Sequence, residues 1–114
     1  MAEEDFNPIE EGRRIAREYL SKRGWAKEWR RALNTQLYPA VQREEFEEKE
    51  RRIDRMEEEA EAGFSNAYDK WRKDESPPAR EVLRAIYDLL GKRTDLGFIG
   101  TRIVDRLKRE FTSF

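Results

Sequence analysis

The chain contains neither cysteine nor histidine among its 114 residues. Without cysteine it has no disulfide and no thiol nucleophile, and without either residue it has no zinc site built on nitrogen or sulfur ligands. Acid–base catalysis by histidine is excluded for the same reason. We therefore expect a protein that is not an enzyme, with no catalytic residue, no metal ion, no cofactor and no small-molecule substrate.

Apolar residues are also scarce. They make up 37% of the chain, whereas charged residues make up 43%, compared with about 25% charged residues in an ordinary globular protein. The hydrophobic core must therefore be thin. No apolar run approaches the roughly 20 residues that span a bilayer, and the acidic start, Met1 to Asp5, lacks the basic and apolar regions of a signal peptide. We expect no membrane span and no secretion by a signal peptide.

Strand signals are missing, because β-branched residues never alternate with polar ones over a useful length. Helix signals are frequent. Asn7-Pro8-Ile9-Glu10 combines an N-cap, a proline in the first turn and a returning glutamate. Gly24 is placed to end this first helix. A second helix is expected from Trp25 to Leu37, with Trp25 and Trp29 in the core, before Pro39 breaks it.

The remaining chain divides at Gly63 and at Asp74-Glu75-Ser76-Pro77-Pro78. The fold prediction is all-α with four to five helices. Its segments are an acidic start and basic N-terminal helical arm (1–38), a highly charged helix (39–63), a short helix and proline linker (64–78), and a C-terminal antiparallel helix hairpin (79–114), whose last helix is capped by Thr94.

Opposite charges are segregated along the chain although the net charge is only -1. Residues 12–38 carry eight bases and two acids, and residues 40–62 carry five bases and ten acids. Of the 24 basic residues 17 are arginine, which prefers bidentate contact with phosphate or carboxylate. This arginine bias fits a hot environment, and a GC-rich genome would produce it equally well.

Two sets of cations are candidates for nucleic-acid contact. They are Arg13, Arg14, Arg17, Lys22, Arg23, Lys27, Arg30 and Arg31 in the first set, and Arg102, Arg106 and Arg109 in the second. Cations so placed can follow a phosphate backbone and release its counterions. The alternative is that the first set pairs with the acidic helix, within one subunit or between subunits. The sequence leaves both open.

The charged helix carries a narrow apolar stripe that can bury only one edge against another helix. The candidate subunit-interface residues are Phe46, Ile53, Met56 and Trp71. The acidic clusters 44–48 and 57–61 are expected to form a solvated, ion-paired face rather than a magnesium site. Gly97 and Gly100 are expected to allow close approach of helices rather than to form a phosphate-clamping loop.

The basic arm from Arg13 to Arg31, the bend at Tyr38-Pro39 and the helix pair from Arg80 to Phe111 together resemble the major coat proteins of filamentous DNA viruses that infect hyperthermophilic archaea. In that family, two related subunits pair and wrap the genome, which they hold in A-form. The resemblance implies that residues 13–31 face DNA, that the C-terminal pair forms the outer packing unit, and that the protein is found in the virion or the host cytoplasm.

The leading expectation is therefore a structural nucleoprotein subunit that wraps double-stranded DNA without sequence specificity and forms a homo-oligomer or pairs with a related subunit. The alternative is a helical protein–protein adaptor of phage or mobile-element origin that binds no nucleic acid. Whether the cations from Arg13 to Arg31 stay exposed in the free subunit discriminates between them.

Overall fold

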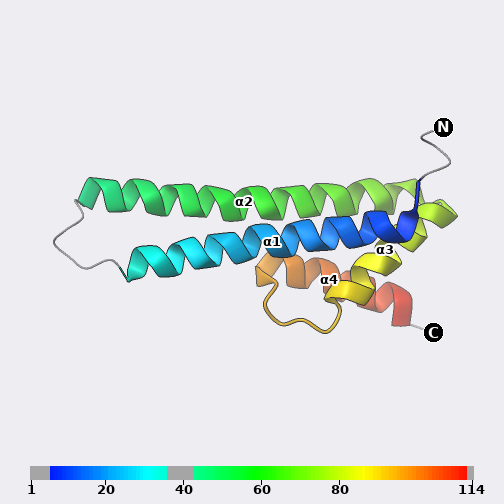
Figure 1. Cartoon of the computed structure of the whole chain (residues 1–114). Helices are drawn as coiled ribbons and strands as arrows, with labels where there is room; N and C mark the ends of the chain where they lie inside the picture. The colour runs from blue at the N-terminus through cyan, green and yellow to red at the C-terminus, as the bar shows by residue number, and fades with distance from the viewer. Residues whose placement is uncertain (1–5, 36–42, 113–114) are drawn as a thin grey trace.

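The computed structural model describes residues 6–35 and 43–112. Within these ranges the chain forms four helices and no strand, which confirms the all-α prediction. The helices are α1 (Pro8–Asn34), α2 (Arg43–Asp74), α3 (Pro77–Leu90) and α4 (Gly97–Thr112). In Figure 1, α1 and α2 lie side by side as the two long helices. Helix α3 contacts both of them, and α4 contacts α2 and α3.

The start of α1 follows the capping signal in the sequence. The side chain of Asn7 accepts hydrogen bonds from the backbone N–H groups of Ile9 and Glu10 at 3.0 and 3.2 Å, and Pro8 is the first helical residue. The predicted end at Gly24 is wrong, because α1 continues to Asn34. A glycine lowers helix stability by only about 1 kcal/mol relative to alanine. The packing of the α1 residues that precede and follow Gly24 in the two apolar clusters outweighs that cost.

The predicted break at Gly63 is wrong for the same reason, and α2 runs through it to Asp74. The proline linker is shorter than expected. Glu75 takes the left-handed conformation (φ 56°), and Ser76 accepts a hydrogen bond from the N–H of Ala79 as the N-cap of α3. The predicted bend at Pro39 lies outside the described residues.

The packing of α1 differs from the extended, basic N-terminal arm that the sequence suggested. Its most extensive contacts are with α2 and α3, and α3 contacts α1 more extensively than it contacts α4. The approach of α1 to α3 is close at Gly12, where a Cβ atom would lie 2.3 Å from the carbonyl oxygen of Val82. Helix α1 therefore packs extensively against α2 and α3, whereas α4 packs against α2 and α3.

The last helix begins later than predicted. Thr94 does not cap it, because α4 starts at Gly97 after the loop that follows α3. Leu96 precedes the helix and is 1% exposed, and Gly97 has a positive φ of 73°. The loop thus places one leucine in the core and turns the chain at a glycine, which adopts this conformation without steric cost.

The apolar side chains form two clusters of different size. The main cluster joins all four helices, and its buried residues include Ile15, Tyr19, Phe64, Ile86 and Leu107. A smaller cluster lies between α1 and α2, where Ala26, Leu33 and Ile53 are buried and Phe46 and Met56 pack against them. We call the parts of α1 and α2 that hold this smaller cluster, residues 24–34 and 43–57, the extension. Figure 1 shows it projecting beyond α3 and α4.

The prediction that Trp25 and Trp29 are core residues is wrong. Their exposed fractions are 66% and 64%. Because α1 does not break at Gly24, the inward face set by Ile15 and Tyr19 continues without a change of phase to Ala26 and Leu33. The two tryptophans fall outside that face.

Candidate nucleic-acid interface

Several of the α1 cations predicted to contact DNA pair with acids of α1 itself. These pairs are Arg14 with Glu11 and with Glu18 (2.8 Å for the latter), Lys22 with Glu18 (3.0 Å), and Arg31 with Glu28 (3.5 Å). The hydrogen bond from Lys22 is the main cause that lowers the pKa of Glu18 below its ordinary value. All of these side chains remain partly exposed, so the paired carboxylates offset their positive potential without removing them from the surface.

Arg23 and Arg30 pair across to α2. The guanidinium of Arg30 donates hydrogen bonds to Asp54 at 2.9 Å and to Glu57 at 3.0 Å, which raises its pKa. Arg23 lies 3.9 Å from Glu61, and its side chain is 24% exposed. These two arginines hold the basic and acidic helices of one subunit together, and they are poorly placed to contact a phosphate backbone.

Three other α1 cations keep their charge available. Arg13, Arg17 and Lys27 are exposed and form no ion pair with any other described residue. Arg13 and Arg17 line a shallow groove of about 630 Å³ together with Glu10 and Glu11. The nearby carboxylates weaken the positive potential of this groove.

The strongest concentration of unpaired arginines is on α4. Arg102, Arg106 and Arg109 are exposed, and no acid of the described chain lies within ion-pair distance of them. Their spacing of four and three residues places them along one side of the helix. They line a groove of about 730 Å³ whose other lining residues are Thr94, Gly97, Phe98, Thr101 and Asp105.

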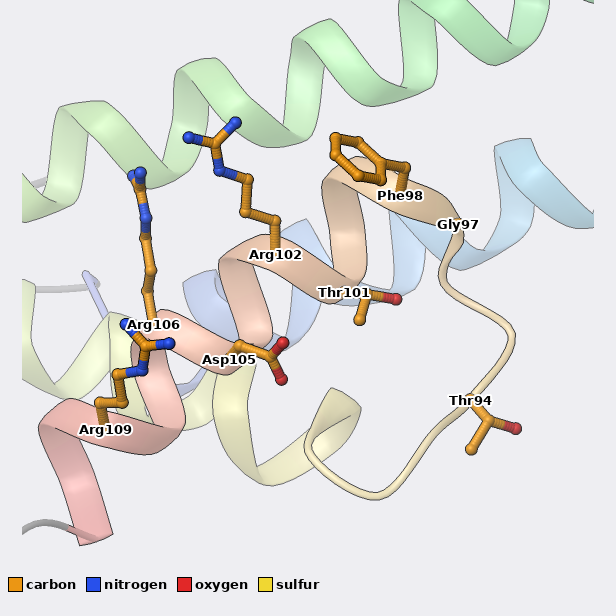
Figure 2. Close-up of a pocket in the computed structure, with 8 residues that line it drawn as sticks. All are labelled: Thr94, Gly97, Phe98, Thr101, Arg102, Asp105, Arg106 and Arg109. Carbon is orange, nitrogen blue, oxygen red and sulfur yellow. The ribbon is translucent and has the colours of Figure 1, made fainter.

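The groove combines three kinds of side chain. In Figure 2, Arg102, Arg106 and Phe98 extend to the side of α4 on which α2 is drawn, whereas Thr101 and Asp105 extend away from it. Phe98 is 77% exposed, so its ring is available for stacking. Two hydroxyl groups, one aromatic ring and three arginines can hydrogen-bond, stack on and neutralise a polyanion, with Asp105 as the single acid among them.

The inner side of α4 fixes this outer face in place. Ile103, Val104 and Leu107 are buried in the main cluster. Gly100 lies so close to Tyr19 that a Cβ atom there would be 2.7 Å from the tyrosine oxygen. Gly100 therefore allows the side chain of Tyr19 to approach α4 closely, as predicted, whereas Gly97 has a positive φ and a Cβ atom there would meet the guanidinium of Arg23. A rigid backbone lies beneath the three arginines, and only their side chains need to adapt to a ligand.

The carboxylates of the described ranges can also be compared with the needs of a metal site. No group of three or more carboxylates in the described ranges is arranged to hold a metal ion. In the cluster at the start of α2, Glu47 pairs with Arg43 at 3.2 Å and Glu48 with Arg52 at 2.9 Å. These are i,i+4 pairs of the kind expected for a solvated helical face.

The predicted interface stripe contributes to packing within the subunit. Ile53 is buried between α1 and α2, with Phe46 and Met56 packed beside it. Trp71 packs on the main cluster and stacks with Phe6, with ring centroids 5.8 Å apart. Because Ile53 is only 2% exposed, the α1–α2 contact already accounts for its burial. A partner contact by these four residues stays a prediction.

Sequence reasoning missed the exposed tryptophan pair of the extension. The signal was available, because one uninterrupted helical phase from Ile15 to Leu33 leaves Trp25 and Trp29 outside the buried face. The assumed break at Gly24 concealed it.

Within the described chain, no helix is both long and apolar enough to cross a membrane. Comparisons with protein-family models, with curated proteins and with solved structures find no match to this chain. Its function is therefore argued from its own residues.

Proposed function

We propose that the protein is a structural, non-enzymatic nucleoprotein subunit that coats double-stranded DNA without sequence preference. The observation that carries the proposal is the row of unpaired arginines on α4, Arg102, Arg106 and Arg109, which lines a groove with Phe98. The proposal keeps the coat-like role suggested by the sequence and moves the principal DNA contact from α1 to α4.

The dimensions of this row suit a phosphate backbone. Arg109 follows Arg102 by seven positions of one helix, which corresponds to roughly 10 Å along the axis. Duplex DNA carries one negative charge per ≈ 1.7 Å of its axis, so several phosphates would lie within reach of three arginines. Phosphate contacts of this kind position a protein on DNA but carry no sequence information.

The α1 cations have a secondary role in this proposal. Arg13, Arg17 and Lys27 remain free to add weak contacts, whereas Arg23 and Arg30 serve the α1–α2 packing. The acidic outer face of α2 would repel DNA, and this restricts the surfaces that can bind it. A net charge of -1 is therefore compatible with a subunit whose binding face is local.

The test is DNA binding by the variant in which Arg102, Arg106 and Arg109 are all alanine. Fluorescence anisotropy with a random-sequence duplex, measured across a salt series, gives both affinity and salt slope. We expect weaker binding and a slope smaller by about 2.7, since each neutralised phosphate contributes about 0.9. The matched control replaces Arg51, Arg52 and Arg55 of α2, which removes the same charge from the acidic helix. Equal losses in both variants would contradict a specific role of α4.

A second candidate function is a helical protein–protein adaptor. The observation that favours it is the exposure of Trp25 and Trp29, 66% and 64%, because large exposed aromatic side chains are typical of protein-binding surfaces. A wild-type protein that binds no duplex even at low salt would favour this function over the first.

A further inference from the structure

The extension exposes more apolar surface than a solvated helix pair needs. Trp25 and Trp29 are one turn apart on α1, and about two thirds of each side chain is in contact with solvent. Tryptophan is among the side chains that contribute most to binding when a partner buries them. The small cluster beneath them, Ala26, Leu33 and Ile53, is too thin to cover such rings within one subunit.

Beside Trp29 is a cavity of about 510 Å³ in the groove between α1 and α2. Its lining residues are Glu28, Trp29, Ala32, Leu33, Lys49 and Ile53. Its centre is apolar, with one acid on α1 and one base on α2. Lys49 forms no ion pair with the rest of the described chain, and Glu28 contacts only Arg31, at 3.5 Å, with both side chains about two thirds exposed.

The same groove continues along the molecule. A second cavity, of about 240 Å³, is lined on its α2 side by Ala60, Gly63, Phe64 and Ala67. At Gly63 a Cβ atom would have no neighbour within 4 Å. No described residue of α3 or α4 lines either cavity, so one long face of the α1–α2 pair is not covered by α3 or α4.

We propose that this face binds the same face of a second copy of the chain, so that the two extensions form a four-helix bundle. A two-fold axis parallel to the helices would place α1 of each copy opposite α2 of the other. Residues at the same height along the groove would then face each other. Glu28 would therefore meet Lys49 of the second copy, and the reverse pair would form at the symmetric position.

Charge complementarity indicates that the partner bound to this face is a second copy of the chain. The α1 half of the extension is basic and the α2 half is acidic, since residues 24–34 carry three bases and one acid whereas residues 43–57 carry five bases and seven acids. The two-fold arrangement sets each basic half against an acidic half. It also packs Trp29 of each copy against the part of the other copy's cavity that Ile53 lines. Paired anchor residues of this kind contribute most of the binding energy of many interfaces. This assembly goes beyond the proposed DNA contact, because the residues involved are on different helices from the α4 groove.

The first measurement is the mass of the wild-type protein by sedimentation equilibrium over a wide concentration range, without DNA. A reversible monomer–dimer equilibrium is expected. The variant in which Trp25 and Trp29 are alanine should raise the dimer dissociation constant by at least about thirtyfold, the usual effect of losing one strong interface anchor. A wild-type protein that stays monomeric throughout would overturn the proposal and leave the face to a partner of different sequence.

Charge reversal tests the arrangement itself. Glu28→Lys and Lys49→Glu should each weaken the dimer, because each puts like charges together, and the double variant should restore association. Both positions are exposed, and circular dichroism of each variant checks that helix content is unchanged. If the double variant dissociates more than either single one, the two-fold pairing is wrong. DNA affinity of the Trp25/Trp29 variant, measured separately, distinguishes failure of this inference from failure of the α4 assignment.

Discussion

The hydroxyl group of Tyr19 on α1 donates a buried hydrogen bond of 2.6 Å to the carbonyl oxygen of Leu96, the residue before α4. The ring of Tyr19 also stacks on Phe64 of α2, with centroids 4.3 Å apart. One side chain thus joins α1, α2 and the start of α4. The position of the arginine groove relative to the two long helices depends on this contact.

Tyr19→Phe should destabilise the protein by about 1–3 kcal/mol, because the substitution leaves the buried carbonyl oxygen of Leu96 without its donor. Urea unfolding followed by circular dichroism measures the loss. The matched control is Tyr87→Phe. The ring of Tyr87 stacks on Phe111, and its change should stay within about 0.5 kcal/mol. Equal effects of the two substitutions would show that the Tyr19 hydroxyl has no special role.

Gly100→Ala should be destabilising by about 1–3 kcal/mol, since the added Cβ atom would lie 2.7 Å from the oxygen of Tyr19 and 2.9 Å from the Cβ of Leu96. Gly24→Ala is the control, and its effect on stability should have the opposite sign. It adds a methyl group where no atom lies within 4 Å and should stabilise α1 by about 0.5–1 kcal/mol. Thermal unfolding of both variants is sufficient, and a stable Gly100→Ala protein would contradict the close approach of the Tyr19 side chain to Gly100.

The contrast between these glycines shows what the sequence could predict. Local signals were sufficient for the cap at Asn7 and for a new helix after the Ser76-Pro77-Pro78 segment, although they assigned the two prolines to the linker and not to the first turn of α3. They were not sufficient at Gly24, because a glycine ends a helix only where tertiary packing does not continue on both sides. The error at that one residue also misplaced Trp25 and Trp29, since helical phase carries over from one segment to the next.

For the candidate site too, some residues could be identified from the sequence and others could not. Sequence spacing identified Arg102, Arg106 and Arg109 as one row, because residues on a short amphipathic helix keep a fixed phase. It could not separate Arg13 from Arg30, which both occur in the same basic segment. That difference arises from the partner helix, where Asp54 and Glu57 are within 3.0 Å of Arg30.

The lowered pKa of Glu18 predicts a pH dependence. The hydrogen bond from Lys22 and the charges of Lys22 and Arg14 favour its ionised form, so its folded pKa lies below the ordinary value of 4.5. A group of this kind contributes stability that is present above pH 4.5 and is lost as pH falls through its folded pKa. NMR titration of the Glu18 carboxyl should show the low value in the wild-type protein and a value closer to 4.5 in Lys22→Ala. An unchanged titration in that variant would exclude Lys22 as the main cause.

Arg30→Ala should show whether Arg30 contributes to α1–α2 packing or to DNA binding. It removes the two hydrogen bonds that join α1 to Asp54 and Glu57, and it leaves both carboxylates without their cation. Because the Arg30 side chain is 35% exposed, solvent screening limits the expected loss of stability to about 0.5–1.5 kcal/mol. Arg43→Ala is the matched control, since its pair with Glu47 is on a side chain 88% exposed and should contribute within about 0.5 kcal/mol. Urea unfolding measures both, and the anisotropy assay with duplex DNA should give similar affinities for the two variants. If Arg30→Ala weakened DNA binding as strongly as the α4 triple variant while leaving stability unchanged, Arg30 would belong to the DNA-binding surface and α1 would regain the role that the sequence first suggested for it.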